Sequence, residues 1–105
     1  MRPSDLKDVV TLERNTPTQD AGGAPIDNWA PVAVVRGAIE PLSGREFFDA
    51  GRVIGDVSHR IRIRYRTGVT EAMRAVSADR IFNIQAVLEV ERRRQLHLMA
   101  RELKA

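Results

Sequence analysis

Four arginines occupy alternate positions in one short stretch of this chain, and they are the side chains best suited to bind a charged partner. The row consists of Arg60, Arg62, Arg64 and Arg66. Guanidinium groups bind carboxylates and phosphates, so the row is a candidate for facing DNA or a protein partner. The pattern favours the simpler interpretation of a solvated outer face, with acidic residues such as Glu89 on an adjoining strand supplying cross-strand ion pairs.

The residue types that carry catalysis are not arranged for it. His59 and His97 are the only histidines, and neither has a second metal ligand at helical or hairpin spacing. The chain has no cysteine, its serines lie in no nucleophile-elbow context, and its carboxylates form no pair at a telling spacing. Gly22 and Gly23 do not follow a phosphate-binding loop pattern. The sequence therefore predicts no enzyme activity, no cofactor and no metal site.

The arginine row must lie on a β-strand. His59, Ile61, Ile63 and Tyr65 alternate with the arginines, and strict period two places the two sets on opposite faces of a half-buried strand. We expect this strand to span residues 58–67. A lone oligonucleotide-binding surface would interleave exposed aromatic rings with the arginines, but Tyr65 is in phase with the isoleucines.

Further strands follow from β-branched and alternating segments. We expect them at residues 9–14, 32–42, 73–76, 80–90 and 95–103, with a bulge at Gly37 in the second. In the strand at 80–90, Phe82 and Leu88 should share one face. In the last strand, Leu96 should face inward and Met99 outward. These elements predict a mainly β protein, a small antiparallel β-barrel or sandwich.

Two segments interrupt the strands. Ser43 and Glu46 form a capping box, and Gly51 supplies a left-handed stop, which predicts a short inserted helix at residues 44–50. The segment from Asn15 to Asn28 is rich in Gly, Pro and Asp, and we expect a long exposed loop that a partner would hold. Candidate assembly residues in these segments and at their borders are Trp29, Phe47, Phe48, Gly22 and Gly23.

Length and composition limit the class of protein. The 105 residues suit a single domain, residues 1–105, and the net charge of +3 with a pI near 10.2 allows a polyanionic partner without requiring one. The lack of cysteine suits a reducing compartment. No run of about 18 apolar residues is present, so we expect a cytoplasmic protein without a membrane segment.

Taken in order, these pieces resemble the phage head–tail joining proteins, also called head closure, stopper or head–tail adaptor proteins, of tailed phages and prophages. The most diagnostic segment is residues 38–48, Ala-Ile-Glu-Pro-Leu-Ser-Gly-Arg-Glu-Phe-Phe, followed by the arginine row. The resemblance continues through residues 80–84 and the Glu91-Arg92-Arg93 bend. One departure is the turn Ser77-Ala78-Asp79, where similar proteins often carry glycine.

The resemblance implies a structural connector subunit at the neck of a phage, prophage or gene transfer agent virion, made in the host cytoplasm. Such a subunit self-associates into a ring, closes the DNA-filled capsid and provides the tail docking surface. Its implied partners are a portal-bound adaptor protein and tail terminator or tail proteins, with duplex DNA passing through the lumen without sequence readout. The alternative is a small basic nucleic-acid-binding β-barrel that acts as a monomer.

Overall fold

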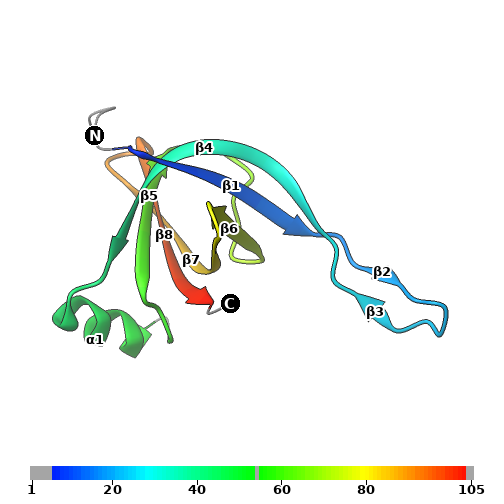
Figure 1. Ribbon diagram of the computed structural model, residues 1–105. Coiled ribbons are helices and arrows are strands. Elements are labelled where there is room, and N and C mark those ends of the chain that lie inside the picture. Colours follow the sequence, from blue (N-terminus) through cyan, green and yellow to red (C-terminus); the bar gives the residue numbers. More distant parts are fainter. Residues whose placement is uncertain (1–5, 54, 104–105) are drawn as a thin grey trace.

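The protein folds into an antiparallel β-barrel with a projecting arm, as the computed structural model shows for residues 6–53 and 55–103 (Figure 1). Within these residues the closed barrel has the strand order β1-β4-β5-β8-β7-β6, and β6 pairs back to β1. The barrel strands are β1 (Asp8–Asn15), β4 (Trp29–Pro41), β5 (His59–Arg64), β6 (Met73–Ser77), β7 (Arg80–Val90) and β8 (Gln95–Leu103). The predicted mainly β barrel with one inserted helix is confirmed, and its last three strands pair as a meander.

Inward-facing aliphatic side chains fill the barrel, together with Phe82. The register places Ile61 opposite Leu98, and Ala75 opposite Phe82, so the alternation along each strand converges on one core. The cluster consists of Val10, Leu12, Ile61, Ile63, Met73, Ala75, Phe82, Ile84, Leu96, Leu98 and Ala100. Most of these side chains are completely buried, and burying such groups is the main source of stability for a domain of this size.

Gly37 is needed by the packing of this core and does not form the bulge expected there. It lies opposite Ile63, and a Cβ atom added to it would approach the Arg62 carbonyl oxygen to 2.9 Å and Ile63 Cγ2 to 3.0 Å. The bulge in β4 occurs earlier, where Leu12 pairs with Ala33 and Glu13 pairs with Pro31. The missing side chain thus makes room for two close strands, and the unpaired residue Val32 provides the bend.

The segment expected to be a long loop is a continuation of β1 and β4. It forms a two-stranded hairpin of β2 (Thr18–Gln19) and β3 (Pro25–Ile26), which extends away from the barrel (Figure 1). The molecule measures 48 × 29 × 26 Å, so the hairpin accounts for its elongation. The Gly, Pro and Asp residues do form a turn, but it is a tight turn between two paired strands and not a long loop.

The inserted helix α1 (Gly44–Val53) starts as expected and runs further. The Ser43 amide donates to Glu46 Oε1 at 3.3 Å, and the Glu46 amide donates to Ser43 Oγ at 3.2 Å, which confirms the capping box. Gly51 lies inside the helix instead of ending it. The left-handed glycine that follows the helix is Gly55, with φ 97°, where a residue without Cβ is favoured.

Three other details differ from the sequence-based expectation. The arginine strand β5 ends at Arg64, because the chain then bends and the Tyr65 amide donates to the Arg94 carbonyl at 3.0 Å. A register shift between Ile84 and Ala86 in β7 turns Val87 toward the core and leaves Leu88 exposed. Met99 lies on the outer face, opposite Arg60, but is nevertheless buried.

Candidate assembly surfaces

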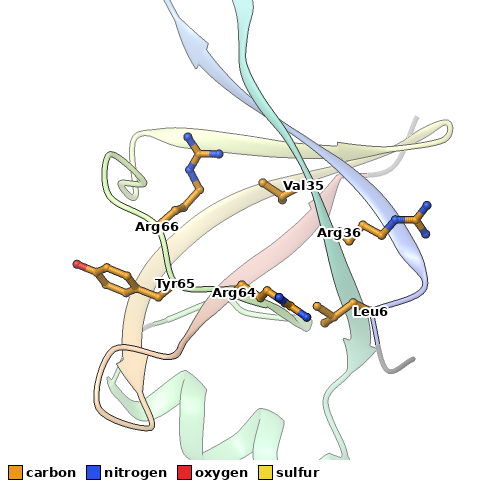
Figure 2. A pocket seen from close by; sticks show the side chains of 6 residues that line it. All are labelled: Leu6, Val35, Arg36, Arg64, Tyr65 and Arg66. Carbon is orange, nitrogen blue, oxygen red and sulfur yellow. The ribbon is translucent and has the colours of Figure 1, made fainter. Parts of the chain in front are cut away.

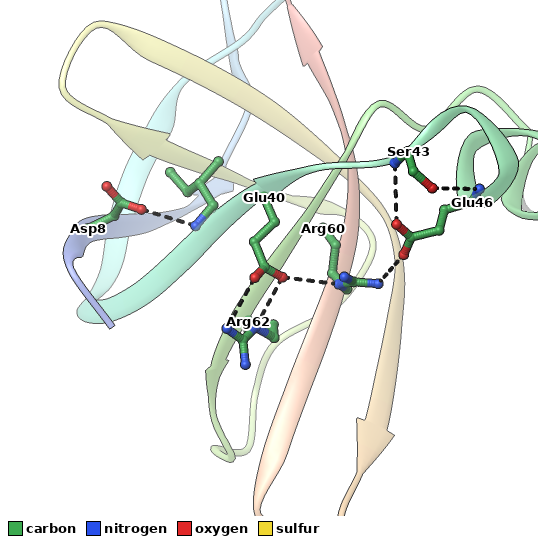
Figure 3. A network of polar contacts seen from close by, with 7 residues as sticks. Asp8, Glu40, Ser43, Glu46, Arg60 and Arg62 are labelled. Atoms are coloured by element: carbon green, nitrogen blue, oxygen red, sulfur yellow. Dashed lines mark hydrogen bonds and ion pairs between the residues drawn. The ribbon is translucent and has the colours of Figure 1, made fainter. Parts of the chain in front are cut away.

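The first half of the arginine row is engaged by two glutamates from different elements (Figure 3). Arg62 binds Glu40 of β4 through Nε and Nη2, at 3.0 and 3.1 Å. Arg60 reaches the same carboxylate at 3.3 Å and also donates to Glu46 of α1 at 2.8 Å. One chain of charges therefore links β5 to β4 and to the start of the inserted helix.

The acids that pair with the row are not the one expected from the sequence. Glu89 pairs with Arg93, four residues away, at 3.6 Å. Glu40 and Glu46 were not identified as partners from the sequence. Glu40 and Ala38 lie on the same face of β4, the strand next to the arginines. The pairing of Glu40 with Arg60 follows from the β4–β5 register, Glu40 opposite Arg60 and Ala38 opposite Arg62.

The charge cluster changes the ionisation of its neighbours. Hydrogen bonds from Arg60, and then from Ser43, hold the pKa of Glu46 below its usual range. Burial, and then the adjacent charges of Arg60 and Arg62, lower the pKa of His97 below 6.5. His97 lies opposite Arg62, so its neutral form is favoured beside the arginines.

The second half of the row lies at one end of the barrel and borders a groove (Figure 2). This groove, of about 380 Å³, is lined by Leu6, Val35, Arg36, Arg64, Tyr65 and Arg66. Arg36 was not among the predicted site residues. The β4–β5 pairing ends where Gly37 is opposite Ile63, and Arg36 and Arg64, the next residue along each strand, both line the groove. Like charges gathered in one groove are unfavourable without an anion between them.

Next to this groove is a charged turn under backbone strain. Glu91, Arg92 and Arg93 all have positive φ values, 53°, 55° and 66°, a left-handed conformation that is costly for residues with a Cβ atom. The turn joins β7 to β8, and a second hollow runs from Arg64 and Tyr65 to this turn. The end of the barrel therefore carries a high density of positive charge.

The projecting hairpin is ordered by its own polar groups. At its tip, Asp20 Oδ1 accepts hydrogen bonds from the Gly22 and Ala24 amides at 2.8 and 2.9 Å. At its base, the Thr16 amide donates to the Asn28 carbonyl at 2.7 Å, and Asn15 Nδ2 donates to Asp27 Oδ1 at 3.1 Å. Every residue from 16 to 28 is exposed, so the arm has a defined shape without a core.

The predicted assembly residues lie in three separate places. Gly22 and Gly23 are at the tip of the hairpin, and Gly23 has φ 85°. Trp29 is at the base, where the Arg74 guanidinium lies 4.4 Å from its ring centre, so it is half-buried by its own chain. Phe48 on α1 is 70% exposed. The side chain of Phe47 lies outside the described part of the chain.

The histidines have structural surroundings. His59 packs edge-on against Phe82 with ring centres 5.3 Å apart, and its Nδ1 lies 2.8 Å from Ser58 Oγ. Within residues 6–53 and 55–103, no group of three or more His, Asp or Glu side chains is placed to hold a metal ion. In the same residues, no helix is long and apolar enough to cross a membrane.

Comparison with known proteins gives a consistent family. Residues 1–103 match the family of phage head completion proteins. A protein from Shigella flexneri 2a, solved in solution, has the same fold, with a TM-score of 0.78, 24% identity, and 97% of this chain and 96% of that chain covered. A chain from the virion of a native gene transfer agent particle matches with a TM-score of 0.70 and 26% identity, covering 99% of this chain and 100% of that one. No curated protein matches.

Proposed function

Because this chain belongs to the phage head completion protein family, we propose that it is a connector subunit of the virion neck. Copies of it form a ring at the head–tail interface, close the DNA-filled capsid and provide the docking surface for the tail. The observation that carries the proposal is the end-to-end match to a chain of the gene transfer agent virion. The match covers 99% of this chain and 100% of that chain, so it rests on the whole barrel and not on a local motif.

The described surfaces are consistent with a structural role. A subunit in a cyclic assembly needs two different lateral faces, one for each neighbour. The hairpin projects from one end of β1, and the groove lies near the other end. Exposed Phe48, on a helix fixed to the barrel by the Arg60–Glu46 pair, offers an apolar contact to an adaptor or tail protein.

The monomeric nucleic-acid-binding alternative has less support. Two of the four arginines in the row, Arg60 and Arg62, already share the carboxylates of Glu40 and Glu46. This leaves fewer cations to neutralise phosphates, and the salt dependence of DNA binding scales with the number of such contacts. We expect the free monomer to bind duplex DNA weakly at most.

The test is reconstitution with the adjacent, portal-bound neck protein. Particles assembled without this protein should hold no tails and should lose packaged DNA, and adding the purified protein should restore tail attachment. Electron microscopy and a nuclease-protection assay measure the two effects. Particles that retain DNA and attach tails in its absence would refute the proposal. Tight, steeply salt-dependent binding of DNA by the monomer, abolished by reversing Arg62 and Arg64 to Glu, would support the alternative.

A further inference from the structure

We propose that the acidic hairpin of one copy (residues 16–28, the arm) seats in the basic groove of the next copy (the groove lined by Leu6, Val35, Arg36, Arg64, Tyr65 and Arg66). The inference rests on the proposed function, because it specifies which two surfaces join neighbouring subunits of the ring. The ligand of the groove is therefore a second copy of this chain.

The arm has the properties of an insertable segment. Residues 16–28 contain two aspartates, Asp20 and Asp27, and no Lys, Arg or His, although the whole chain is basic. Ile26 is 46% exposed, two residues from the base of the arm, with Thr18 opposite it. Isolated two-stranded hairpins are marginally stable in water, and the internal hydrogen bonds that hold this one reduce the entropy lost when it binds.

The groove is complementary to the arm. Among the described residues, its lining includes three arginines, Arg36, Arg64 and Arg66, and no acidic side chain. None of the three makes an ion pair with the part of the chain that the structure describes. Val35 is half-buried and provides apolar surface near these charges, and Leu6 beside it is buried, with 4% of its surface exposed (Figure 2). An aliphatic anchor such as Ile26, next to the carboxylate of Asp27, matches both features.

The geometry excludes the arm of the same copy from the groove. Leu6 lies two residues before the start of β1, and the arm directly follows the end of that strand. The seven steps from Asp8 to Asn15 separate the two ends of β1 by about 23 Å, at ~3.3 Å per residue. The arm extends away from the barrel (Figure 1), so it cannot fold back into its own groove. Joining unlike surfaces in this way is heterologous, and repeated with a suitable rotation it closes a ring.

A cysteine cross-link tests the contact, since the natural chain contains no thiol. Subunits carrying Ile26→Cys are mixed with size-tagged subunits carrying Val35→Cys and assembled on the adjacent neck protein under mild oxidation. The matched control replaces the second variant with Leu88→Cys, which is exposed on β7. We expect the mixed disulfide from the Ile26–Val35 pair to exceed that from the control by about tenfold, since only the former would be held in contact. Equal yields would overturn the inference.

A charge exchange, made in subunits that carry the same cysteine pair, tests whether charge holds the contact. Thr18→Lys places a cation beside Ile26 and should lower the yield of the mixed disulfide by about tenfold. Arg66→Glu on the neighbouring copy should restore the disulfide yield. Gln85→Lys, a change at an exposed position of β7, should leave the yield unchanged. Circular dichroism of each variant verifies folding. A Thr18→Lys yield equal to that of the parent would contradict the inference.

The results separate this inference from the proposed function. If Thr18→Lys subunits still form rings that attach tails, and no arm-to-groove disulfide appears, the arm does not join the copies but the connector function stands. If wild-type protein never enters particles, the proposed function itself is wrong. If Arg36→Glu and Arg66→Glu abolish a salt-dependent binding of duplex DNA and leave ring formation intact, the groove binds nucleic acid and the inference is refuted.

Discussion

At the scale of single residues, the arginine row has two different roles along its length. Arg60 and Arg62 share Glu40 and reach Glu46, so they fasten the inserted helix and β4 to β5. Arg64 and Arg66 instead border the groove. The four arginines alternate regularly in the sequence. Their roles differ because the glutamates on β4 and α1 reach only Arg60 and Arg62.

Glu40 should contribute most to this cluster, because it accepts from both arginines. Glu40→Gln should lower the free energy of unfolding by about 1 kcal/mol, a value near the top of the range for partly exposed ion pairs. Chemical denaturation at low and high salt measures the effect, which should shrink in 1 M NaCl.

The matched control for this change is Glu89→Gln. Its pair with Arg93 is much more exposed, so the expected change is within about 0.5 kcal/mol. Equal effects of the two substitutions would show that the shared carboxylate of Glu40 has no special contribution.

His97 should make the stability depend on pH. Its folded pKa lies below 6.5 because of burial and of the arginines beside it, although Glu40 and Glu91 act in the opposite sense. Below pH 6.5 the unfolded chain therefore binds a proton that the folded chain excludes. The stabilisation from neutral His97 is complete above this pH and is lost as the pH falls.

Thermal denaturation at pH 7.5 and pH 5.5 checks this expectation. The wild-type protein should be less stable at pH 5.5, and His97→Gln should reduce the difference. The pKa of His59 is also lowered, mainly by burial, so the variant should retain part of the slope. The pKa values of Glu46 and Glu102 lie below 4.5, so these two carboxylates affect the stability only in more acidic solution. An unchanged slope in His97→Gln would contradict the expectation.

At the scale of elements, the turns store strain that the strands compensate. The two-residue turn between β6 and β7 contains Ala78 with φ 54°, between the paired residues Ser77 and Arg80. The left-handed run at Glu91, Arg92 and Arg93 joins β7 to β8 in the same manner. β7 and β8 pair along almost their whole length, and this pairing holds the second turn in place.

Ala78→Gly should stabilise the protein. Relief of the left-handed strain is worth about 1–2 kcal/mol, and the extra freedom of glycine in the unfolded chain removes about 0.4–1 kcal/mol of it. The expected net gain is between zero and about 1.6 kcal/mol in the free energy of unfolding, measured by denaturant titration. Ala72→Gly serves as the control, because Ala72 is exposed and does not have a positive φ; it should not stabilise. A loss of stability in Ala78→Gly would show that this turn is not strained.

At the scale of the whole molecule, the barrel and the arm are energetically separate. All members of the buried core cluster belong to the barrel strands, and every residue of the arm is exposed. The same arm makes the molecule long in one direction. The arm lengthens the molecule and contributes no residue to the buried core cluster. Such a segment is suited to contact another chain, as the ring proposed above requires.

Removing the arm should spare folding and damage assembly. Replacing residues 17–26 with Asn-Gly keeps the hydrogen bonds between Thr16 and Asn28. The free energy of unfolding should change by less than about 1 kcal/mol, because shortening an exposed segment alters mainly the loop-closure entropy. Circular dichroism and a reconstitution assay measure the two properties. Loss of the native spectrum, or normal ring formation, would each contradict the prediction.

The sequence by itself determined the strands, the capped helix and the family resemblance. Period-two alternation and the Ser43–Glu46 box are local patterns, and local backbone geometry translates them directly into structure. The same patterns indicated which face of β5 enters the core.

Only the tertiary structure decided which residues meet. Glu40 rather than Glu89 faces the arginines, Leu88 is exposed by a register shift, and Arg36 joins Arg64 at the groove. These outcomes depend on bulges and on the closure of the barrel. A shift of one residue reverses the faces of every position that follows, and no local pattern in this chain specifies where such a shift occurs.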